Sequence, residues 1–215
     1  MSANLGVTVA VLGGGGHAKV VIATLQAAGL AVAAIFDDDV AKHGSVLLGV
    51  EVRGTLAEFV RSSYRHAVIA VGNNAARMRL AEAVQNQLPD VEWITVIHPQ
   101  TCVHQSVRLG AGTVVFAGAV VQPDTVIGAH AVINTAATVD HDCLIGDFVH
   151  IAPGTHLAGG VRIDRGAFIG IGASIIPGCT VGEWATVGAG AAVVKDIPAK
   201  ATAVGVPARW GCGEG

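Results

Sequence analysis

Hydrophobic residues recur at every sixth position through the second half of the chain, from residue 97 to residue 193. A hexad repeat of this kind predicts a parallel β-helix of short strands, with aliphatic side chains stacked inside each coil. Three hexads make one triangular coil of about 18 residues, and no inserted residue interrupts the series. Its seventeen positions hold only Val, Ile or Leu: Ile97, Val103, Leu109, Val115, Val121, Ile127, Ile133, Val139, Ile145, Ile151, Leu157, Ile163, Ile169, Ile175, Val181, Val187 and Val193.

Small residues return at one place in successive coils and predict tight corners. Glycine suits such corners because it has no Cβ. The flat faces between the corners are rich in Ala and Val, and a three-sided prism with such faces favours a homotrimer. A purely structural solenoid is the alternative interpretation of so regular a repeat. The corner column is made of Gly110, Gly128, Gly146 and Gly182, with Asp164 in the intervening place.

The first part of the chain follows another pattern, in which apolar strands alternate with amphipathic helices. Six elements are predicted there: strands at 7–12, 31–36 and 66–72, and helices at about 18–28, 54–60 and 74–88. Such alternation is typical of a parallel sheet covered by helices. We therefore expect a Rossmann-like domain over residues 1–92, followed by a β-helix with a C-terminal tail over residues 93–215.

Composition narrows the classes of function. Charged residues make up 13% of the chain and the formal net charge is -3, without a basic block, which argues against a nucleic-acid partner. Mean hydropathy is high at +0.58, but charged, Gly or polar residues interrupt every stretch of about 18 residues, so no membrane span is expected. The N-terminus lacks the basic region of a signal peptide. The four cysteines show neither metal-ligand spacing nor a dense disulfide pattern, which predicts a reduced, cytoplasmic setting.

The segment TVDHDCLIGDFVHIAPG, residues 138–154, gathers polar groups inside an apolar run. Residues i and i+18 lie on neighbouring strands roughly 4.8 Å apart, which places Gly159 directly beneath His141. A base beside a bare backbone N–H is the minimal set for acyl transfer. Asp140 and Asp142 flank the histidine, and a carboxylate bonded to one ring nitrogen fixes the tautomer and raises the basicity of the other. An ordinary exposed histidine is the alternative interpretation.

Other polar residues of the repeat allow competing hypotheses. His150 is either a partly buried structural histidine or a donor to a ligand. A zinc site would recruit His141, His150 and His156, although their columns do not obviously converge. Cys143 lies close enough to His141 to raise a covalent acyl-enzyme alternative. Cys143 and Cys179 share a column two coils apart, roughly 9.6 Å, which is too far for a disulfide.

The sequence GGGGHA follows the first predicted strand and opens a predicted helix. Gly13, Gly15 and Ala18 satisfy the dinucleotide fingerprint G-x-G-x-x-G/A, and Asp37 and Asp38 stand about twenty residues later. This pattern predicts backbone N–H groups and a helix N-terminus facing a phosphate, with a carboxylate near a ribose or base. A domain of about 90 residues suits a mononucleotide or a nucleotide sugar better than NAD. An NAD-dependent oxidoreductase and a non-catalytic nucleotide-sugar sensor are the alternatives.

The segment VGNN, residues 71–74, ends a later predicted strand. It is expected to line the same crevice, because the carboxyl ends of parallel strands meet at one edge of a sheet. Alternatively, it is only a strand-to-helix turn in which an Asn caps the helix.

Together these motifs resemble those of a known enzyme family. G-G-G-G-H-A near the start, F-D-D-D after the second strand, D-H-D-C-L-I-G-D-F-V-H-I-A-P-G-T in the middle and G-V-P-A-R near the end resemble the nucleotide-sugar N-acetyltransferases of the left-handed β-helix superfamily. The resemblance spans essentially the whole chain and implies left-handed coils. It implies acetyl-CoA-dependent acetylation of the 4-amino group of a nucleotide-linked dideoxy sugar of the GDP-perosamine kind, for surface polysaccharide or O-antigen synthesis. A UDP-linked 4-amino sugar and sialic acid O-acetylation are the alternatives.

The resemblance also implies roles for individual residues. His141 is the expected general base, Asp142 its orienting partner and Gly159 the oxyanion donor in direct attack on the thioester, with no metal and no covalent intermediate. The expected acetyl-CoA contacts are His150, Ile171 and Ala189, the last at a place where the family often has Gly. The expected nucleotide-sugar contacts are Gly14, Gly15, Gly16, His17, Asp37, Asp38, Gly72 and Asn73, with Asn134 reaching the amino sugar from a neighbouring subunit. The resemblance thus implies a homotrimer with active sites at subunit interfaces.

Overall fold

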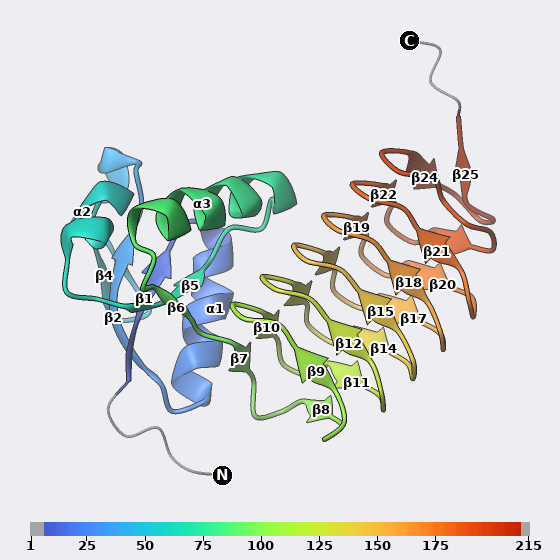
Figure 1. Cartoon of the computed structure of the whole chain (residues 1–215), viewed down its shortest axis with the longest axis horizontal. Coiled ribbons are helices and arrows are strands. Elements are labelled where there is room, and N and C mark those ends of the chain that lie inside the picture. The colour runs from blue at the N-terminus through green and yellow to red at the C-terminus, as the bar shows by residue number, and fades with distance from the viewer. Residues whose placement is uncertain (1–6, 212–215) are drawn as a thin grey trace. The chain divides into compact units, whose positions relative to one another are not determined.

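The computed structural model describes residues 7–211 (Figure 1). The chain divides into two compact units between Pro99 and Gln100. The sequence analysis placed the domain boundary somewhat earlier, after residue 92. Each unit is described by itself.

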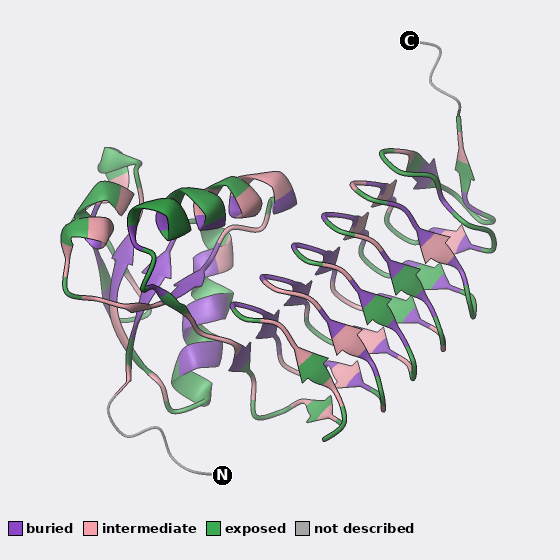
Figure 2. Ribbon diagram, in the orientation of Figure 1, coloured by how far each residue is buried: buried purple, intermediate pink, exposed green. Residues whose placement is uncertain are grey.

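The first unit is an α/β domain around a six-stranded sheet of order β3-β4-β2-β1-β5-β6. All neighbouring strands are parallel except the β3–β4 hairpin. Strands β1 and β5 are largely buried in the middle of the sheet (Figure 2). The strands are β1 (Thr8–Leu12), β2 (Ala31–Phe36), β3 (Val46–Leu47), β4 (Val50–Gly54), β5 (His66–Ile69) and β6 (Glu92–Trp93), and β7 (Val96–Ile97) follows. The helices are α1 (Gly16–Ala27), α2 (Leu56–Arg61) and α3 (Asn74–Gln87), with a 3₁₀ turn at Val40–Lys42.

Local sequence explains where the helices begin. The short helix α2 starts at a capping box, in which the Thr55 side chain accepts the Glu58 N–H and the Glu58 carboxylate accepts the Thr55 N–H. Helix α3 starts after Asn73, whose side-chain oxygen accepts the Ala76 N–H at 2.9 Å. The six predicted elements are present, although the strand predicted over residues 66–72 ends at Ile69. The sequence analysis missed β6 and the β3–β4 hairpin, whose two-residue turn uses positive φ at Leu48 and Gly49.

The second unit is a parallel β-helix in which each coil contributes one short strand to each of three faces. Face I carries β8 (Cys102–Val103), β11 (Val120–Val121), β14 (Thr138–Val139), β17 (His156–Leu157), β20 (Ser174–Ile175) and β23 (Ala192–Val193). Face II carries β9 (Arg108–Leu109), β12 (Val126–Ile127), β15 (Leu144–Ile145), β18 (Arg162–Ile163) and β21 (Thr180–Val181). Face III carries β10 (Val114–Val115), β13 (Val132–Ile133), β16 (His150–Ile151), β19 (Phe168–Ile169), β22 (Thr186–Val187), β24 (Thr202–Val204) and the antiparallel β25 (Arg209–Trp210).

Strand pairing follows the predicted 18-residue step. Val132 pairs with His150, and His150 pairs with Phe168. From Val115 to Val193, all fourteen hexad residues are at most 3% exposed. The first position breaks the series, because Ile97 is 39% exposed and its neighbour Val96 is buried instead.

The corner glycines are required by the distance between coils. A Cβ added at Gly146 would lie 2.6 Å from the backbone nitrogen of Arg165 in the next coil. At Gly182 the added Cβ would press against the backbone of Ala199. These contacts are backbone contacts that no side-chain movement relieves, so the predicted glycine column follows from close stacking.

We predict that Ile151→Ala lowers the free energy of unfolding by about 2–5 kcal/mol, because it leaves a cavity in the stacked interior. Ile151 is fully buried, whereas Leu144 on face II is 48% exposed and supplies the control variant Leu144→Ala. Urea denaturation followed by far-UV circular dichroism measures both. Equal destabilisation by the two substitutions would contradict the inward stacking of the hexad residues.

Candidate functional site

His141 lies in the turn between β14 and β15, at the corner where face I meets face II. Its ring Nδ1 lies 2.8 Å from Asp142 Oδ2, and its backbone N–H donates to Asp140 Oδ1 at 2.8 Å. Asp142 has a φ of 59°, a left-handed conformation that Asp tolerates better than most residues. Asp140 thus holds the backbone of the turn, and Asp142 holds the imidazole ring.

His141 lies against Gly159, as the 18-residue step predicts. A Cβ added at Gly159 would lie 2.6 Å from both Cε1 and Nε2 of the imidazole. The neighbouring Gly160 N–H donates to the His141 carbonyl at 2.9 Å and joins the two coils. Within residues 7–211, the Gly159 N–H donates no hydrogen bond to the protein. The imidazole therefore rests on a bare backbone segment whose N–H is available to a ligand.

The hydrogen bond and the negative charges around His141 favour its action as a base. A carboxylate only accepts hydrogen bonds, so Nδ1 carries the proton toward Asp142 and Nε2 keeps its lone pair. The hydrogen bond to Asp142 raises the pKa of His141 above its usual value, and the negative charges of Asp140 and Asp142 reinforce that effect. The side chain is 60% exposed, so a substrate can reach Nε2. This arrangement can remove a proton from a nucleophile while Gly159 receives the oxyanion.

The geometry does not favour Cys143 as a nucleophile. The thiol is buried and donates to the Ala158 carbonyl at 3.3 Å. Burial raises the pKa of Cys143, which keeps the sulfur in its protonated, poorly nucleophilic form.

The three histidines of the zinc hypothesis are not brought together. His141 lies at the corner of faces I and II, His150 lies on face III, and His156 lies on face I bonded to Thr138 at 2.9 Å. In the described part of the chain, no group of three His, Cys, Asp or Glu side chains is placed to hold a metal ion.

His150 and Asn134 form a second polar pair, on face III. The Asn134 Oδ1 accepts the Thr135 N–H at 2.8 Å, which turns the amide nitrogen toward His150 Nε2 at 3.0 Å. Nε2 of this histidine therefore accepts, and its proton sits on Nδ1. His150 is only 7% exposed, and Phe168 meets its ring edge to face at 5.3 Å.

The remaining acetyl-CoA candidates occupy a different corner from His141. Ile171 follows β19 and Ala189 follows β22, so both lie where face III turns into face I. The Gly190 N–H donates to the Ile171 carbonyl at 2.8 Å, which joins the two coils at this corner. Ile171 is 60% exposed, unusual for so large an apolar side chain. Within one chain, face I separates these residues from His141.

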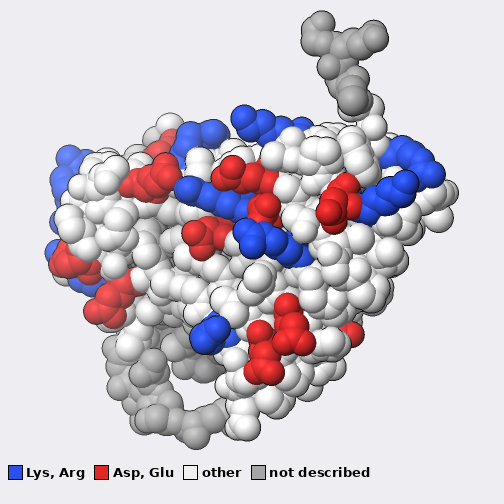
Figure 3. Space-filling model, turned by 45° about the vertical axis from the view of Figure 1, so that its right-hand side comes forward, with Lys and Arg blue, Asp and Glu red and all other residues white. Residues whose placement is uncertain are grey.

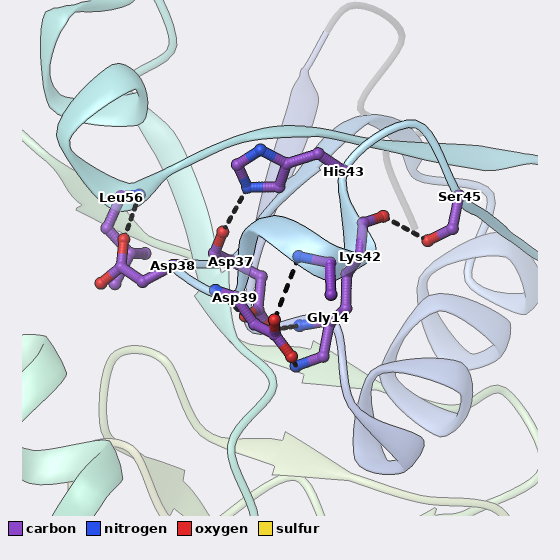
Figure 4. A network of polar contacts seen from close by, with 9 residues as sticks. Gly14, Asp37, Asp38, Asp39, Lys42, His43, Ser45 and Leu56 are labelled. Carbon is purple, nitrogen blue, oxygen red and sulfur yellow. Dashed lines mark hydrogen bonds and ion pairs between the residues drawn. The ribbon is translucent and has the colours of Figure 1, made fainter.

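In the first unit, Asp37 organises the glycine loop (Figure 4). Its Oδ2 accepts the Gly14 N–H at 2.6 Å and the Lys42 ammonium at 3.0 Å, and its Oδ1 accepts the Asp39 N–H at 2.9 Å. Burial tends to raise the pKa of Asp37, but the hydrogen bonds from Asp39, Gly14 and Lys42 hold it below its usual value. A carboxylate engaged in this way has little capacity left for the ribose contact of a dinucleotide site, although Asp37 was expected to touch the ligand.

Asp38 is placed differently from Asp37. Its Oδ1 accepts the Leu56 N–H at 2.9 Å, at the start of α2 (Figure 4). It is exposed and borders a crevice of about 220 Å³ between α2 and α3. The crevice is otherwise mostly apolar and includes Leu56, Val60, Leu80 and Val84. A carboxylate beside an apolar crevice suits a planar nucleobase with N–H donors.

The other nucleotide-sugar candidates meet at the carboxyl ends of two neighbouring strands, β1 and β5. Gly15 and Gly16 are exposed at the N-terminus of α1, with open space around both. His17 follows them, and its ring Cγ lies 3.9 Å from a Cβ built on Gly72, which precedes the capping residue Asn73. Burial, with a smaller contribution from the charge of Arg77, lowers the pKa of His17 to about 4, so this imidazole is neutral at physiological pH.

Three polar residues that hold these sites together, Lys42, Asp140 and Arg77, had no role in the predictions from the sequence. Lys42 has no motif, and its contact with Asp37 depends on the fold of an irregular loop. Asp140 was noticed but given no role. Arg77 is the third, and here the sequence carried a signal, because Arg77 shares the buried stripe of α3 with Ala81 and Val84.

The distribution of surface charge and the length of the helices exclude few further classes of function. Positive and negative side chains are interspersed over the face shown in Figure 3. None of the helices in the described part of the chain has the length and apolar character needed to cross a bilayer.

Comparison with known proteins identifies relatives for both units. Residues 8–84 match the family described as the PglD N-terminal domain. PerB from Caulobacter crescentus, solved in complex with CoA and GDP-perosamine, is 42% identical, superposes with a TM-score of 0.89 and is covered completely by 98% of this chain. The acetyltransferase domain of PglB from Neisseria gonorrhoeae FA1090, solved with acetyl coenzyme A, is also 42% identical, with a TM-score of 0.87 over 94% of this chain and 98% of that domain.

Curated relatives align over shorter segments. UDP-N-acetylbacillosamine N-acetyltransferase of Bacillus subtilis (strain 168) is 40% identical over 116 residues, which is 50% of this chain and 50% of that protein. Protein L142 of Acanthamoeba polyphaga mimivirus is 32% identical over 47% of this chain, but only 19% of that protein is covered. The chain thus spans half or less of these curated relatives. Its agreement with PerB confirms the predicted fold, a Rossmann-like domain followed by a left-handed β-helix.

We predict that Asp142→Asn lowers the pKa of His141, because the amide removes the charged acceptor that favours the imidazolium. Asn tolerates the left-handed backbone of residue 142, so the turn is retained. An NMR titration of the imidazole resonances measures the shift. Glu183→Gln, which removes an exposed carboxylate elsewhere in the β-helix, is the control and should leave the titration unchanged. An unshifted His141 in Asp142→Asn would contradict the assigned pair.

Proposed function

This chain belongs to the family of nucleotide-sugar N-acetyltransferases that includes PerB, and we propose that it transfers the acetyl group of acetyl-CoA to the 4-amino group of a nucleotide-linked dideoxy sugar. The observation that carries the proposal is the imidazole of His141 resting on Gly159 and held by Asp142. A base and a backbone N–H in contact are what an amine needs to attack a thioester.

The proposed reaction is a direct displacement. The sugar amine attacks the thioester carbonyl carbon and forms the C–N bond, while His141 Nε2 takes a proton from the nitrogen. The Gly159 N–H stabilises the oxyanion of the tetrahedral intermediate. When the C–S bond breaks, the imidazolium returns its proton to the departing thiolate, so CoA leaves as a thiol. Asp142 holds the ring and stabilises its charged form between these steps.

We further propose a GDP-linked substrate resembling GDP-perosamine. PerB holds that compound and is similar over the whole of this chain, whereas the Bacillus subtilis relative named for a UDP-linked sugar aligns over half. The Asp38 carboxylate beside its apolar crevice suits the paired N–H donors of guanine. The proposed product, an N-acetylated nucleotide sugar, serves surface polysaccharide or O-antigen synthesis in the cytoplasm. The three described cysteines are free, as a reducing compartment requires.

The site is proposed to be completed by a second copy of the chain in a homotrimer. His141 lies at one edge of face I, and Ile171 and Ala189 lie at its other edge. Three prisms packed around a threefold axis can bring the first corner of one chain against the second corner of the next. Acetyl-CoA then lies in the groove between subunits, contacting His150, Ile171 and Ala189, while Asn134 faces the amino sugar.

A free-thiol assay tests the activity. We predict that acetyl-CoA releases thiol in the presence of a GDP-linked 4-amino-4,6-dideoxy sugar, but not with its 4-hydroxy analogue. His141→Asn should lower kcat about 100-fold or more, because the general base is lost. His104→Asn, an exposed histidine of the same β-helix bonded to Ser106, is the control and should retain wild-type turnover.

Two outcomes would overturn this assignment. Near wild-type turnover of His141→Asn at every pH would remove the histidine from the mechanism. Binding of NADH without binding of CoA, measured by calorimetry, would support the oxidoreductase instead. Nucleotide-sugar binding without any thiol release would support a sensor.

Complementation tests the shared site. His141→Asn and Ile171→Glu are each expected to be inactive, since one lacks the base and the other places a charge in the cofactor groove. When the two are dissociated, mixed in equal amounts and reassembled, about one quarter of the sites receive both native residues and activity returns to about that fraction. Sedimentation velocity should report a trimer. A monomer, or a mixture without recovery, would contradict a shared site.

A further inference from the structure

Asp37 follows strand β2 and places a carboxylate against the glycine loop. Its Oδ2 accepts the Gly14 N–H at 2.6 Å, and a Cβ added at Gly14 would lie 3.3 Å from the same oxygen. The Asp37 side chain is only 14% exposed. Burial tends to raise its pKa, but the hydrogen bonds from Asp39, Gly14 and Lys42 hold that pKa below its usual value. The carboxylate is therefore negatively charged at neutral pH.

A negative charge at this place opposes the binding of an anionic ligand. The next two residues of the loop, Gly15 and Gly16, open α1 with space around both, and the N-terminus of a helix attracts phosphate. Asp37 begins a run of three acids with Asp38 and Asp39. Like charges at short range repel each other strongly where water is partly excluded. A diphosphate on this loop therefore requires a counter-charge for Asp37.

Lys42 supplies that counter-charge. Its ammonium lies 3.0 Å from Asp37 Oδ2, the oxygen that also accepts the Gly14 N–H (Figure 4). It lies 3.6 Å from Asp39 Oδ2 as well. The hydrogen bond to Asp37 raises the pKa of Lys42 above its usual value, so the ammonium stays charged. One lysine thus faces two of the three acids.

The 3₁₀ turn Val40–Lys42 brings the lysine to the carboxylate. Asp39 caps this turn, since its Oδ1 accepts a backbone N–H of the turn at 3.1 Å. The Asp39 N–H donates to Asp37 Oδ1 at 2.9 Å, and His43 Nε2 donates to the Asp37 carbonyl at 2.8 Å. The turn is therefore bonded to Asp37 both before and after the lysine.

Folding stability alone is a weak reason for this ion pair. The Lys42 side chain is 36% exposed, and ion pairs that include so exposed a group contribute little to the free energy of unfolding. The pair lies instead beside the loop that opens α1, where the charge of Asp37 acts on whatever anion approaches. Its main consequence is therefore electrostatic and concerns the ligand.

We propose that Lys42 is a positioning residue, which neutralises Asp37 and holds it against Gly14 so that the glycine loop accepts the diphosphate of the nucleotide sugar. The inference rests on the proposed function for the identity of the ligand. It assigns a role to a lysine that acts through Asp37 and does not itself touch the substrate.

Calorimetry with GDP and with guanosine tests this role, because the two ligands share base and ribose and differ in the phosphates. Lys42→Met keeps much of the length and removes the charge. It should weaken GDP binding at least about 10-fold, because the unbalanced Asp37 repels the phosphates, and change guanosine binding by less than about 2-fold. Lys42→Arg retains the charge and should bind GDP nearly as tightly as the wild type. Lys200→Met, which replaces an exposed lysine of the β-helix, is the control and should alter neither affinity.

The double variant Lys42→Met/Asp37→Asn separates charge from structure. Asparagine keeps an oxygen for the Gly14 N–H but carries no charge, so the double variant should bind GDP more tightly than Lys42→Met alone. Added salt should also reduce the difference between Lys42→Met and the wild type, since the Debye length falls to about 3 Å at 1 M ionic strength.

A merely structural role gives a different result. The affinities of Lys42→Met for GDP and guanosine then fall together, and adding Asp37→Asn weakens GDP binding further; that outcome would overturn the proposal. If Lys42→Met does not fold, Lys42→Gln decides with the same two ligands. A loss confined to GDP supports the proposal, and a loss of both affinities or of neither overturns it.

Binding of GDP alone separates this inference from the proposed function. A wild type that binds GDP but transfers no acetyl group contradicts the proposed function, while a selective loss of GDP affinity in Lys42→Met still supports the inference. Equal GDP affinity in the wild type and Lys42→Met overturns the inference and leaves the activity standing. A wild type that binds GDP no more tightly than guanosine also overturns it, because the phosphates then gain nothing from the loop.

Discussion

The 18-residue register of the β-helix is the constraint on which the rest of the second unit depends. Each coil pairs with the next residue by residue, so a side chain keeps the same neighbour above and below along the prism. At the corner glycine Gly146, an added Cβ would press against the backbone of the next coil. The same closeness places the ring of His141 on Gly159. A contact between residues 18 positions apart in sequence is thus a product of the spacing that builds the core.

That regularity also limits what one chain can do. The faces of a stacked prism are flat, so the polar side chains that the repeat displays stand out at its corners. His141 stands at one edge of face I, and the exposed Ile171 stands at the other. The first unit differs, because loops at the carboxyl ends of its parallel strands line a crevice. Binding of the sugar nucleotide and transfer of the acetyl group therefore call for two different architectures.

Features set by periodicity could be predicted from the sequence, and features set by side-chain hydrogen bonds could not. The hexads predicted the β-helix and the His141–Gly159 column, and they failed to predict burial at Ile97, which is 39% exposed while Val96 beside it is buried. The hairpin β3–β4 was missed because two short strands carry little periodic signal. The bonds of Asp37 to Gly14 and Lys42 were not predicted, because they depend on how an irregular loop folds back over the carboxylate. The hydrogen bonds from Arg77 to the Val71 and Gly72 carbonyls depend on the direction of those two carbonyls, which the spacing of residues in the sequence does not predict.

The two histidines of the predicted sites show how environment assigns chemistry to one side-chain type. His141 is exposed beside carboxylates, which favour its charged form, and so it can take a proton and hold it. His17 is buried beside a cation, which favours its neutral form, and so it cannot gain a proton near neutral pH.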